Sequence, residues 1–173
     1  MSLHELDLAE RVSDRIVCVK GEKIEHFGTP EEVFAKGFVN QLYDISEGTF
    51  QEENGTVELK KTEGKPEIFV IAGNGSGSFT FRYLQRKGIP FAAGILGEQD
   101  IDYPAAKALA AKVVSEKAYE DFTEKSYEEA RQIMTSCRKV ICCQKNFGTQ
   151  NERNRQLLED AKMAGMEIEL WQK

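Results

Sequence analysis

Histidine, metal-binding cysteine pairs and long apolar runs are scarce or missing in this sequence, and each absence excludes a class of protein. The 173 residues include two histidines, His4 and His26, so residues 67–173 hold no Ser-His-Asp catalytic set. No apolar run approaches the roughly 20 residues that a membrane-spanning helix needs, and the N-terminus lacks the basic-then-apolar form of a secretory signal. We therefore expect any membrane association to come through a partner.

The four cysteines, Cys18, Cys137, Cys142 and Cys143, form no C-x-x-C pair, and the histidines provide no zinc-binding spacing with them. Cys142 and Cys143 fall in an apolar run typical of a strand, where neighbouring side chains point to opposite faces and small buried thiols are common. This pattern predicts reduced thiols and a cytoplasmic protein. A redox or metal-binding role is the alternative.

The charge balance excludes further classes. A formal net charge of −6 and a pI near 5.1 argue against nonspecific binding to nucleic acid or anionic lipid, because both need a basic surface. Hydrophobic residues make up 40% of the chain, which is enough for a packed core. The length suits one domain, or a small domain with an appendage.

The first 37 residues predict a short α+β segment. Its elements, in order, are a helix over residues 4–12, strands over 14–20 and 23–27, and a helix over 30–36 that stops at Gly37. Thr29, Pro30 and Glu32 form a capping box with proline at the first helical position. These elements are too few to bury a core, which indicates the remnant of a larger domain.

This segment resembles the tail of an ABC transporter ATPase subunit, most closely in importers of iron–siderophore, haem and cobalamin. The matching pieces are His4-Glu5-Leu6-Asp7-Leu8-Ala9, Ser13-Asp14-Arg15-Ile16-Val17, Gly21-Glu22-Lys23-Ile24 and Gly28-Thr29-Pro30-Glu31-Glu32-Val33. The resemblance implies that His4 is the switch histidine, which contacts the γ-phosphate of ATP. It also implies ATP and Mg²⁺ in the complete protein, a homodimer, and attachment to the inner face of the membrane through membrane subunits.

The other ATP-binding motifs of that family are absent from this sequence. The phosphate-binding loop, the signature motif and the catalytic carboxylate should all precede His4. We therefore expect the chain to be the C-terminal piece of a longer ATPase, inactive by itself. The alternative for His4 is a frayed surface residue.

Residues 38–66 predict a hairpin and a linker. Residues 48–53 and 56–61 flank Asn54-Gly55, the strongest signal for a two-residue type I′ turn. Residues 62–66, TEGKP, form a charged stretch that breaks regular structure. The expected organisation is an ATPase tail over residues 1–37, the hairpin and linker over 38–66, and an accessory domain over 67–173.

Strand and helix patterns alternate from residue 67 onward. Strands are predicted over residues 68–72, 91–96, 112–116, 139–143 and 167–171, and helices over 78–87, 104–111, 126–137 and 152–164, with a capping box at Ser126 and Glu129. This alternation predicts an α/β fold, a Rossmann-like doubly wound five-stranded parallel sheet. Parts of it, Ala93-Gly94-Ile95-Leu96, Asp100-Ile101-Asp102-Tyr103 and Ala108-Leu109-Ala110, resemble an accessory domain appended to some ATPases of cobalamin and iron-complex importers.

A glycine-rich loop after the first strand of this domain is the best candidate for ligand binding. The predicted site comprises Gly73, Asn74, Gly75, Ser76, Gly77 and Ser78, with Glu98, Asp100 and Asn146 from neighbouring loops. Ser78 stands where a dinucleotide fingerprint has its third glycine, which argues against NAD or FAD. The acids Glu98, Asp100 and Asp102 favour a nucleoside-like or cationic ligand over a polyphosphate. Alternatively, the acids form a solvated rim, with Asp102 or Tyr103 leading a helix, and the loop binds nothing.

These patterns favour a regulatory region of an ABC importer ATPase for an iron complex or cobalamin, one that senses a small cytoplasmic ligand. Resemblance supports the tail, and the strand–helix pattern supports the appended domain. One alternative is a small nucleotide- or cofactor-dependent enzyme, and another is a dimerisation or interaction domain.

Overall fold

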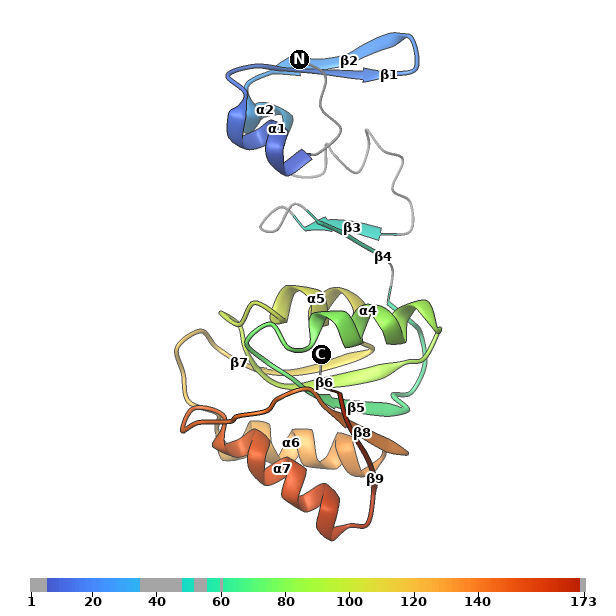
Figure 1. Cartoon of the computed structure of the whole chain (residues 1–173), viewed down its shortest axis with the longest axis vertical. Coiled ribbons are helices and arrows are strands. Elements are labelled where there is room, and N and C mark those ends of the chain that lie inside the picture. Colours follow the sequence, from blue (N-terminus) through green and yellow to red (C-terminus); the bar gives the residue numbers. More distant parts are fainter. Residues whose placement is uncertain (1–5, 35–47, 52–55, 60, 172–173) are drawn as a thin grey trace. The chain divides into compact units, whose positions relative to one another are not determined.

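The computed structural model describes residues 6–34, 48–51, 56–59 and 61–171 (Figure 1). The chain divides into two compact units, residues 1–60 (unit 1) and residues 61–173 (unit 2). His4 lies outside the described residues. None of the described helices is both long enough and apolar enough to cross a membrane.

Unit 1 begins with helix, hairpin and capped helix. These are α1 (Leu6–Val12), β1 (Ile16–Lys20), β2 (Lys23–Gly28) and α2 (Pro30–Val33), with β1 and β2 antiparallel. The predicted capping box at Thr29 is confirmed: its hydroxyl accepts from the Glu32 amide at 3.4 Å, and the Glu32 carboxylate accepts from the Thr29 amide at 2.9 Å. Helix α2 ends earlier than predicted, with Phe34 as its C-cap, and the predicted stop at Gly37 lies outside the described residues.

A second antiparallel hairpin in unit 1 consists of β3 (Gly48–Gln51) and β4 (Thr56–Leu59). Its register differs from the prediction. A two-residue turn at Asn54-Gly55 would place Glu53 opposite Thr56, whereas Thr56 pairs with Gln51. The predicted type I′ turn at Asn54-Gly55 itself lies outside the described residues.

Unit 2 is built on a five-stranded parallel sheet, which confirms the predicted α/β fold. Its strands are β5 (Ile68–Ile71), β6 (Phe91–Gly97), β7 (Lys112–Glu116), β8 (Lys139–Cys142) and β9 (Glu167–Leu170). Their order across the sheet is β7-β6-β5-β8-β9. The chain builds outward from β5 in one direction, then returns to its other side, so the switch point lies between β5 and β8.

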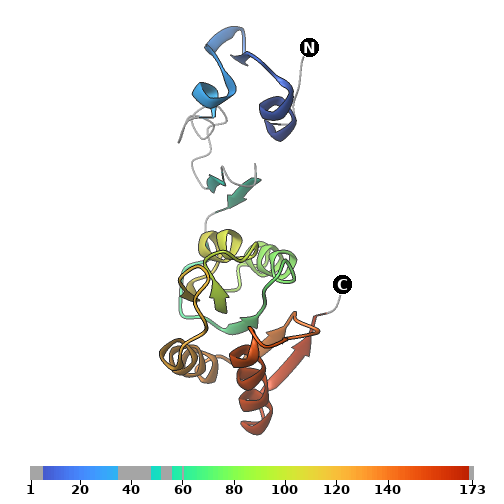
Figure 2. The same ribbon diagram turned by 90° about the vertical axis from the view of Figure 1, so that its left-hand side faces the viewer.

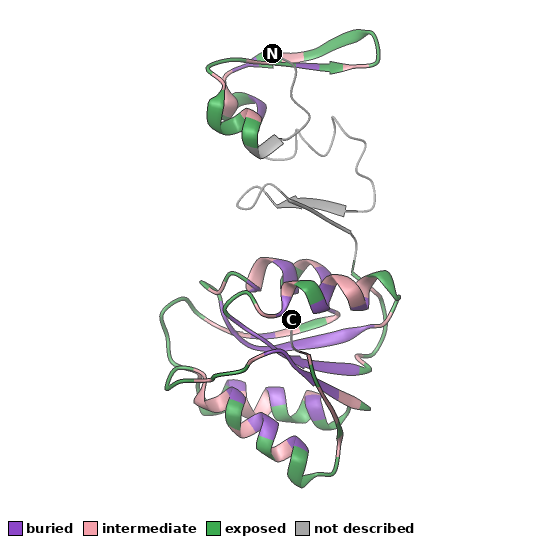
Figure 3. Cartoon of the chain, viewed as in Figure 1, coloured by how far each residue is buried: buried purple, intermediate pink, exposed green. Residues whose placement is uncertain are grey.

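Helices cover both faces of this sheet (Figures 1 and 2). Helices α4 (Ser78–Arg86) and α5 (Tyr103–Leu109) lie on one face, and α6 (Glu124–Thr135) and α7 (Glu152–Met163) on the other. Strand β5 shows why both faces need a cover. Ile68 and Val70 belong to the core under α4 and α5, while Phe69 and Ile71 belong to the core over α6 and α7. All of β5 is buried, as Figure 3 shows.

Helix α6 begins two residues before its predicted start. Its N-cap is Thr123, whose hydroxyl accepts from the Ser126 amide at 3.2 Å. Ser126 is therefore the third helical residue, and the predicted capping box of Ser126 with Glu129 is wrong. The Glu129 carboxylate lies 3.0 Å from the Lys112 ammonium instead.

Candidate functional site

A crevice of about 1150 Å³ opens at the carboxyl ends of β5 and β8, at the switch point of the sheet. It is lined by the loop that follows β5, by helix α4, by the loop after β6, by the loop after β8, and by the end of β9. Parallel strands point their carboxyl ends to one edge, which brings these segments together although they lie far apart in sequence.

Seven of the predicted binding residues line this crevice: Gly73, Asn74, Gly75, Ser76, Ser78, Asp100 and Asn146. Gly77 and Glu98 are not among the described lining residues. Gly77 is buried beneath the loop, and Glu98 is exposed on the strand-following turn, where its amide donates to the Glu116 carbonyl at 2.9 Å.

The glycine loop is held by two carboxylates from the loop after β6. The Asn74 amide donates to both oxygens of Asp100, at 3.0 and 2.8 Å. The amides of Gly77 and Ser78 each donate to Asp102 at 2.9 Å, and the Ser78 hydroxyl donates to it at 2.6 Å. Asp102 is fully buried, so a solvated rim describes Glu98 but not Asp102.

Asp102 therefore caps a helix other than its own. It stands at the N-cap position of α5 but makes no side-chain bond to that helix. Its carboxylate instead takes the free amides at the start of α4, where a phosphate sits in many βα nucleotide sites. The Asp102 carboxylate occupies the position that a phosphate would take, so the start of α4 is not open to a polyphosphate.

The close packing of the loop explains one of its glycines. A Cβ at Gly77 would lie 2.5 Å from Ala72 Cβ and 2.6 Å from the Phe81 ring carbon Cζ. These distances are shorter than real Cβ contacts, so only glycine lets α4 start this near to β5. The glycine at this position serves internal packing.

The crevice is also lined by cations that were not among the predicted binding residues. Arg82 and Arg86 come from α4, and Lys145 comes from the loop after β8. Phe79 also lines the crevice from α4, and residues 79, 82 and 86 share one helix face at i, i+3 and i+7. That spacing is the signal that was available in the sequence.

Aromatic side chains line the same crevice. The Trp171 ring centroid is 6.3 Å from that of Phe79 and 5.1 Å from that of Tyr83. Phe147 lines the crevice from the loop after β8. The lining of the crevice therefore combines aromatic side chains with positive charge.

The charges in the crevice contrast with those of the whole chain. The described lining residues include three cations, Arg82, Arg86 and Lys145, and one carboxylate, Asp100, which already accepts from the Asn74 amide. The formal net charge of the chain is −6. This distribution favours an anionic ligand over the cationic ligand that the acidic loop indicated.

One thiol, that of Cys143, lies among the described residues of the crevice. Burial raises the pKa of the Cys143 thiol to about 11, and Cys143 Sγ lies 3.3 Å from the Thr80 hydroxyl. It is therefore a thiol near neutral pH. Within the described ranges, no group of three or more His, Cys, Asp or Glu side chains is placed to hold a metal ion.

Gln144 contributes a polar group at the floor of the crevice. Its side-chain nitrogen lies 2.8 Å from the position that a Cβ of Gly73 would take. Its side-chain oxygen is buried and has no hydrogen-bond partner among the described residues. Such an unmet acceptor is uncommon in folded proteins.

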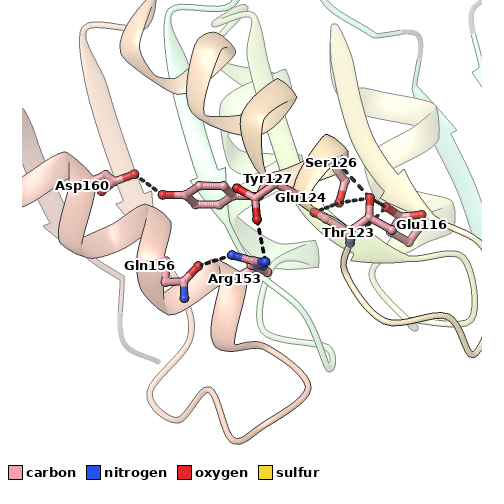
Figure 4. Close-up of polar contacts among 8 residues, drawn as sticks. All are labelled: Glu116, Thr123, Glu124, Ser126, Tyr127, Arg153, Gln156 and Asp160. Carbon is pink, nitrogen blue, oxygen red and sulfur yellow. Dashed lines mark hydrogen bonds and ion pairs between the residues drawn. The ribbon is translucent and has the colours of Figure 1, made fainter.

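A second polar cluster joins α6 to α7, away from the glycine loop (Figure 4). The Tyr127 hydroxyl donates to Asp160 at 2.5 Å, and Arg131 lies 3.2 Å from the same carboxylate. Arg153 pairs with Glu124 at 2.6 Å and stacks over the Tyr127 ring at 5.4 Å. Burial, and then the bond to Asp160, raise the pKa of Tyr127 to about 12. Each group has a partner, so the cluster ties the two helices together.

Comparison with known proteins gives relatives for both the domain and its context. A family model described as the MJ0874 family matches residues 91–172. The "Uncharacterized protein MJ0874" of Methanocaldococcus jannaschii is 34% identical over 68 residues, which are 39% of this chain and 73% of that protein.

A second relative in the same organism is the "Uncharacterized ABC transporter ATP-binding protein MJ0873". It is 36% identical over 97 residues, which are 56% of this chain and 33% of that protein. The chain thus spans about a third of the length of that relative. No solved structure gives a significant match.

Proposed function

Since this chain belongs to the MJ0874 family, and since it is also similar to an ABC transporter ATP-binding protein, we propose that it is the regulatory C-terminal region of an ABC importer ATPase. The observation that carries the proposal is the 36% identity to that ATP-binding protein over 97 residues. The importer type follows from the resemblance of residues 4–33 to importers of iron complexes and cobalamin. In this proposal, unit 2 senses a small cytoplasmic ligand.

An uncovered apolar face on unit 1 supports its role as part of a larger ATPase. The cross-strand pairs Val17–Phe27 and Val19–Ile24 bring four apolar side chains to one face of the first hairpin, and all four are exposed. Exposed apolar clusters of this kind mark contact surfaces. We assign this face to the nucleotide-binding part of the ATPase.

ATP and Mg²⁺ belong to the complete ATPase in this proposal, because the chain lacks a G-x-x-x-x-G-K-[ST] loop. His4 would supply the switch histidine to a site built mainly by other residues. The complete protein would act as a homodimer on the cytoplasmic face of the membrane, attached through the membrane subunits of the transporter.

Unit 2 would regulate transport through a ligand in its switch-point crevice. A ligand shifts an ATPase cycle only if it binds one state of the dimer more tightly than the other. Typical couplings of this kind are about 1 to 3 kcal/mol, which correspond to changes of roughly 5- to 150-fold in affinity. The crevice has the concave shape and mixed polar and aromatic lining of small-molecule sites.

The test is the ATPase activity of the complete subunit, assembled with its transporter, with and without residues 61–173. We expect deletion to change the basal rate or its dependence on a cytoplasmic small-molecule extract, because the regulatory unit is gone. The matched control is a variant that keeps unit 2 but carries Glu98→Ala on its exposed surface, which should behave as the wild type. Rates unchanged by the deletion, with and without extract, would refute the regulatory role.

A further inference from the structure

We infer that the crevice of unit 2 binds a flat anionic ligand, an aromatic heterocycle that carries a phosphate or carboxylate group. In this binding mode Arg82, Arg86 and Lys145 hold the charge, and Trp171 and Phe79 flank the ring. The inference deepens the proposed sensing function and rests on it for its biological role. The binding mode itself rests on the geometry of the crevice.

Amides of the glycine loop are already engaged and are not free to hold the anion. The amides of Gly77 and Ser78 already donate to Asp102, and the Asn74 amide donates to Asp100. A phosphate at the start of α4 would have to displace a buried carboxylate and would then lie beside it. Repulsion between the two charges disfavours that arrangement.

Three cations line the same crevice from segments other than the glycine loop. Arg82 and Arg86 are four residues apart on α4, so their side chains leave the same face of the helix. Lys145 lines the crevice from the loop after β8. Guanidinium groups bind phosphate and carboxylate through paired N–H donors, so the two arginines suit a planar or tetrahedral anion.

Phe79 and Trp171 line the same crevice as the cations, with their ring planes tilted by 43° to one another. Trp171 follows β9 and contacts Phe79 and Tyr83, which lie one helical turn apart on α4. The Phe79 side chain is 45% exposed, although it is large and apolar. A heterocycle stacked on these rings would bury apolar area that otherwise faces water, and aromatic stacking adds to that gain.

Amide side chains form much of the polar lining of the crevice. Gln99, Gln144, Asn146, Gln150 and Asn151 all line the crevice. An amide presents both donors and acceptors, as do the edges of a nitrogen heterocycle. The polar part of the crevice thus matches a ring with mixed hydrogen-bonding groups better than it matches a bare aliphatic acid.

The experiment uses Trp171, the single tryptophan of the chain, as a built-in reporter. Residues 1–173 are titrated with adenosine 5′-monophosphate and with flavin mononucleotide, and each is compared with its uncharged counterpart, adenosine or riboflavin. We expect the phosphorylated compounds to quench Trp171 fluorescence with Kd values at least about 10-fold lower, because the charge contacts are lost in the counterparts. Inorganic phosphate should compete with both.

Variants of the cations locate the site. The double variant Arg82→Gln/Arg86→Gln should lose the preference for the phosphorylated compound, and Lys145→Gln should weaken it by about 3-fold or more. Arg155→Gln, which removes an exposed arginine outside the crevice, is the matched control and should change nothing. Thermal unfolding of each variant checks that it is folded, and Lys145→Gln remains informative if the double variant is not.

Three results would overturn the inference: no quenching by either phosphorylated compound, equal affinity for the charged and uncharged forms, or a phosphate preference that survives loss of the arginines. These results are separable from the test of regulation. If the phosphorylated compounds quench Trp171 but the ATPase rate is unchanged by deletion of unit 2, the proposed function is wrong and the binding site is supported. An ATPase that responds to the deletion, together with no quenching, would overturn the site alone.

Discussion

The first hairpin of unit 1 exposes its apolar side chains, whereas the parallel sheet of unit 2 buries them. In unit 1, the hairpin of β1 and β2 leaves the pairs Val17–Phe27 and Val19–Ile24 exposed. In unit 2, every residue of β5 is buried, because helices cover both faces of the sheet (Figure 3). Unit 2 therefore contains its own core, whereas the first hairpin of unit 1 presents a surface that suits a partner.

Producing each unit by itself is the most severe test of this difference between the units. We expect residues 61–173, made alone, to unfold cooperatively, because both core clusters of the sheet lie within them. Residues 1–60, made alone, should lack a cooperative transition, because Cys18 and Val33 are the buried apolar residues in the part of unit 1 that the structure describes, which is little to offset chain entropy. Circular dichroism during heating and the dispersion of amide NMR signals measure both.

Two melting results would contradict this prediction for the separated units. A sharp melting transition in residues 1–60 would mean that unit 1 needs no further cover. A large loss of stability in residues 61–173, relative to the complete chain, would mean that unit 1 covers part of unit 2. Either result would contradict the conclusion that unit 2 has a complete core of its own whereas unit 1 needs a partner to cover its exposed strands.

Within unit 2, the two acids of the loop after β6 provide a finer comparison. Asp102 is buried and accepts from the Gly77 and Ser78 amides, whereas Glu98 is exposed. We expect Asp102→Ala to lower the free energy of unfolding by about 3 kcal/mol, because it leaves these amides without an acceptor. Glu98→Ala should change it by no more than about 0.5 kcal/mol. Urea unfolding of both variants measures the difference.

Asp102→Asn separates hydrogen bonding from packing. It keeps the size of the side chain but turns one acceptor into a donor that faces an amide, so its loss should be intermediate. A stability equal to that of the wild type in Asp102→Ala would show that water replaces the carboxylate without penalty. The glycine loop would then be open to a phosphate, contrary to the geometry described above.

The strands and helices of unit 2 were predictable because their signals are local. Apolar runs mark each strand, and the predicted strand ends agree with the structure to within one residue. The start of α6 was not predictable from the sequence, because Ser126 with Glu129 satisfies the capping-box pattern as well as any true helix start does. Only the hydrogen bond at Thr123 distinguishes the two starts.

The site was less predictable because it depends on contacts between distant segments. That the glycine loop lies at the crevice followed from the strand–helix alternation and the rule for switch points. That Asp102 fills the start of α4 did not follow, because the two segments are separated by a strand and a helix. Arg82, Arg86 and Trp171 were missed because each is unremarkable until the strand order brings α4, β8 and β9 together.

The smallest expected effect concerns Tyr127, which links α6 to α7. Tyr127→Phe removes the hydrogen bond to Asp160, and we expect a loss of about 1 kcal/mol near pH 7. Tyr119→Phe is the matched control, because Tyr119 is 91% exposed and should have little effect. Urea unfolding at a series of pH values measures both variants against the wild type.

The pH dependence gives this prediction its sign. The pKa of Tyr127 is raised in the folded protein to about 12, above its ordinary value of about 10. Its stabilising contribution is therefore complete below about pH 10 and is lost as the pH rises through about 12. The wild type should converge on Tyr127→Phe over that range, because only the wild type has this proton to lose. A difference that stayed constant with pH would assign the effect of Tyr127 to packing against Arg153 instead of to its hydroxyl.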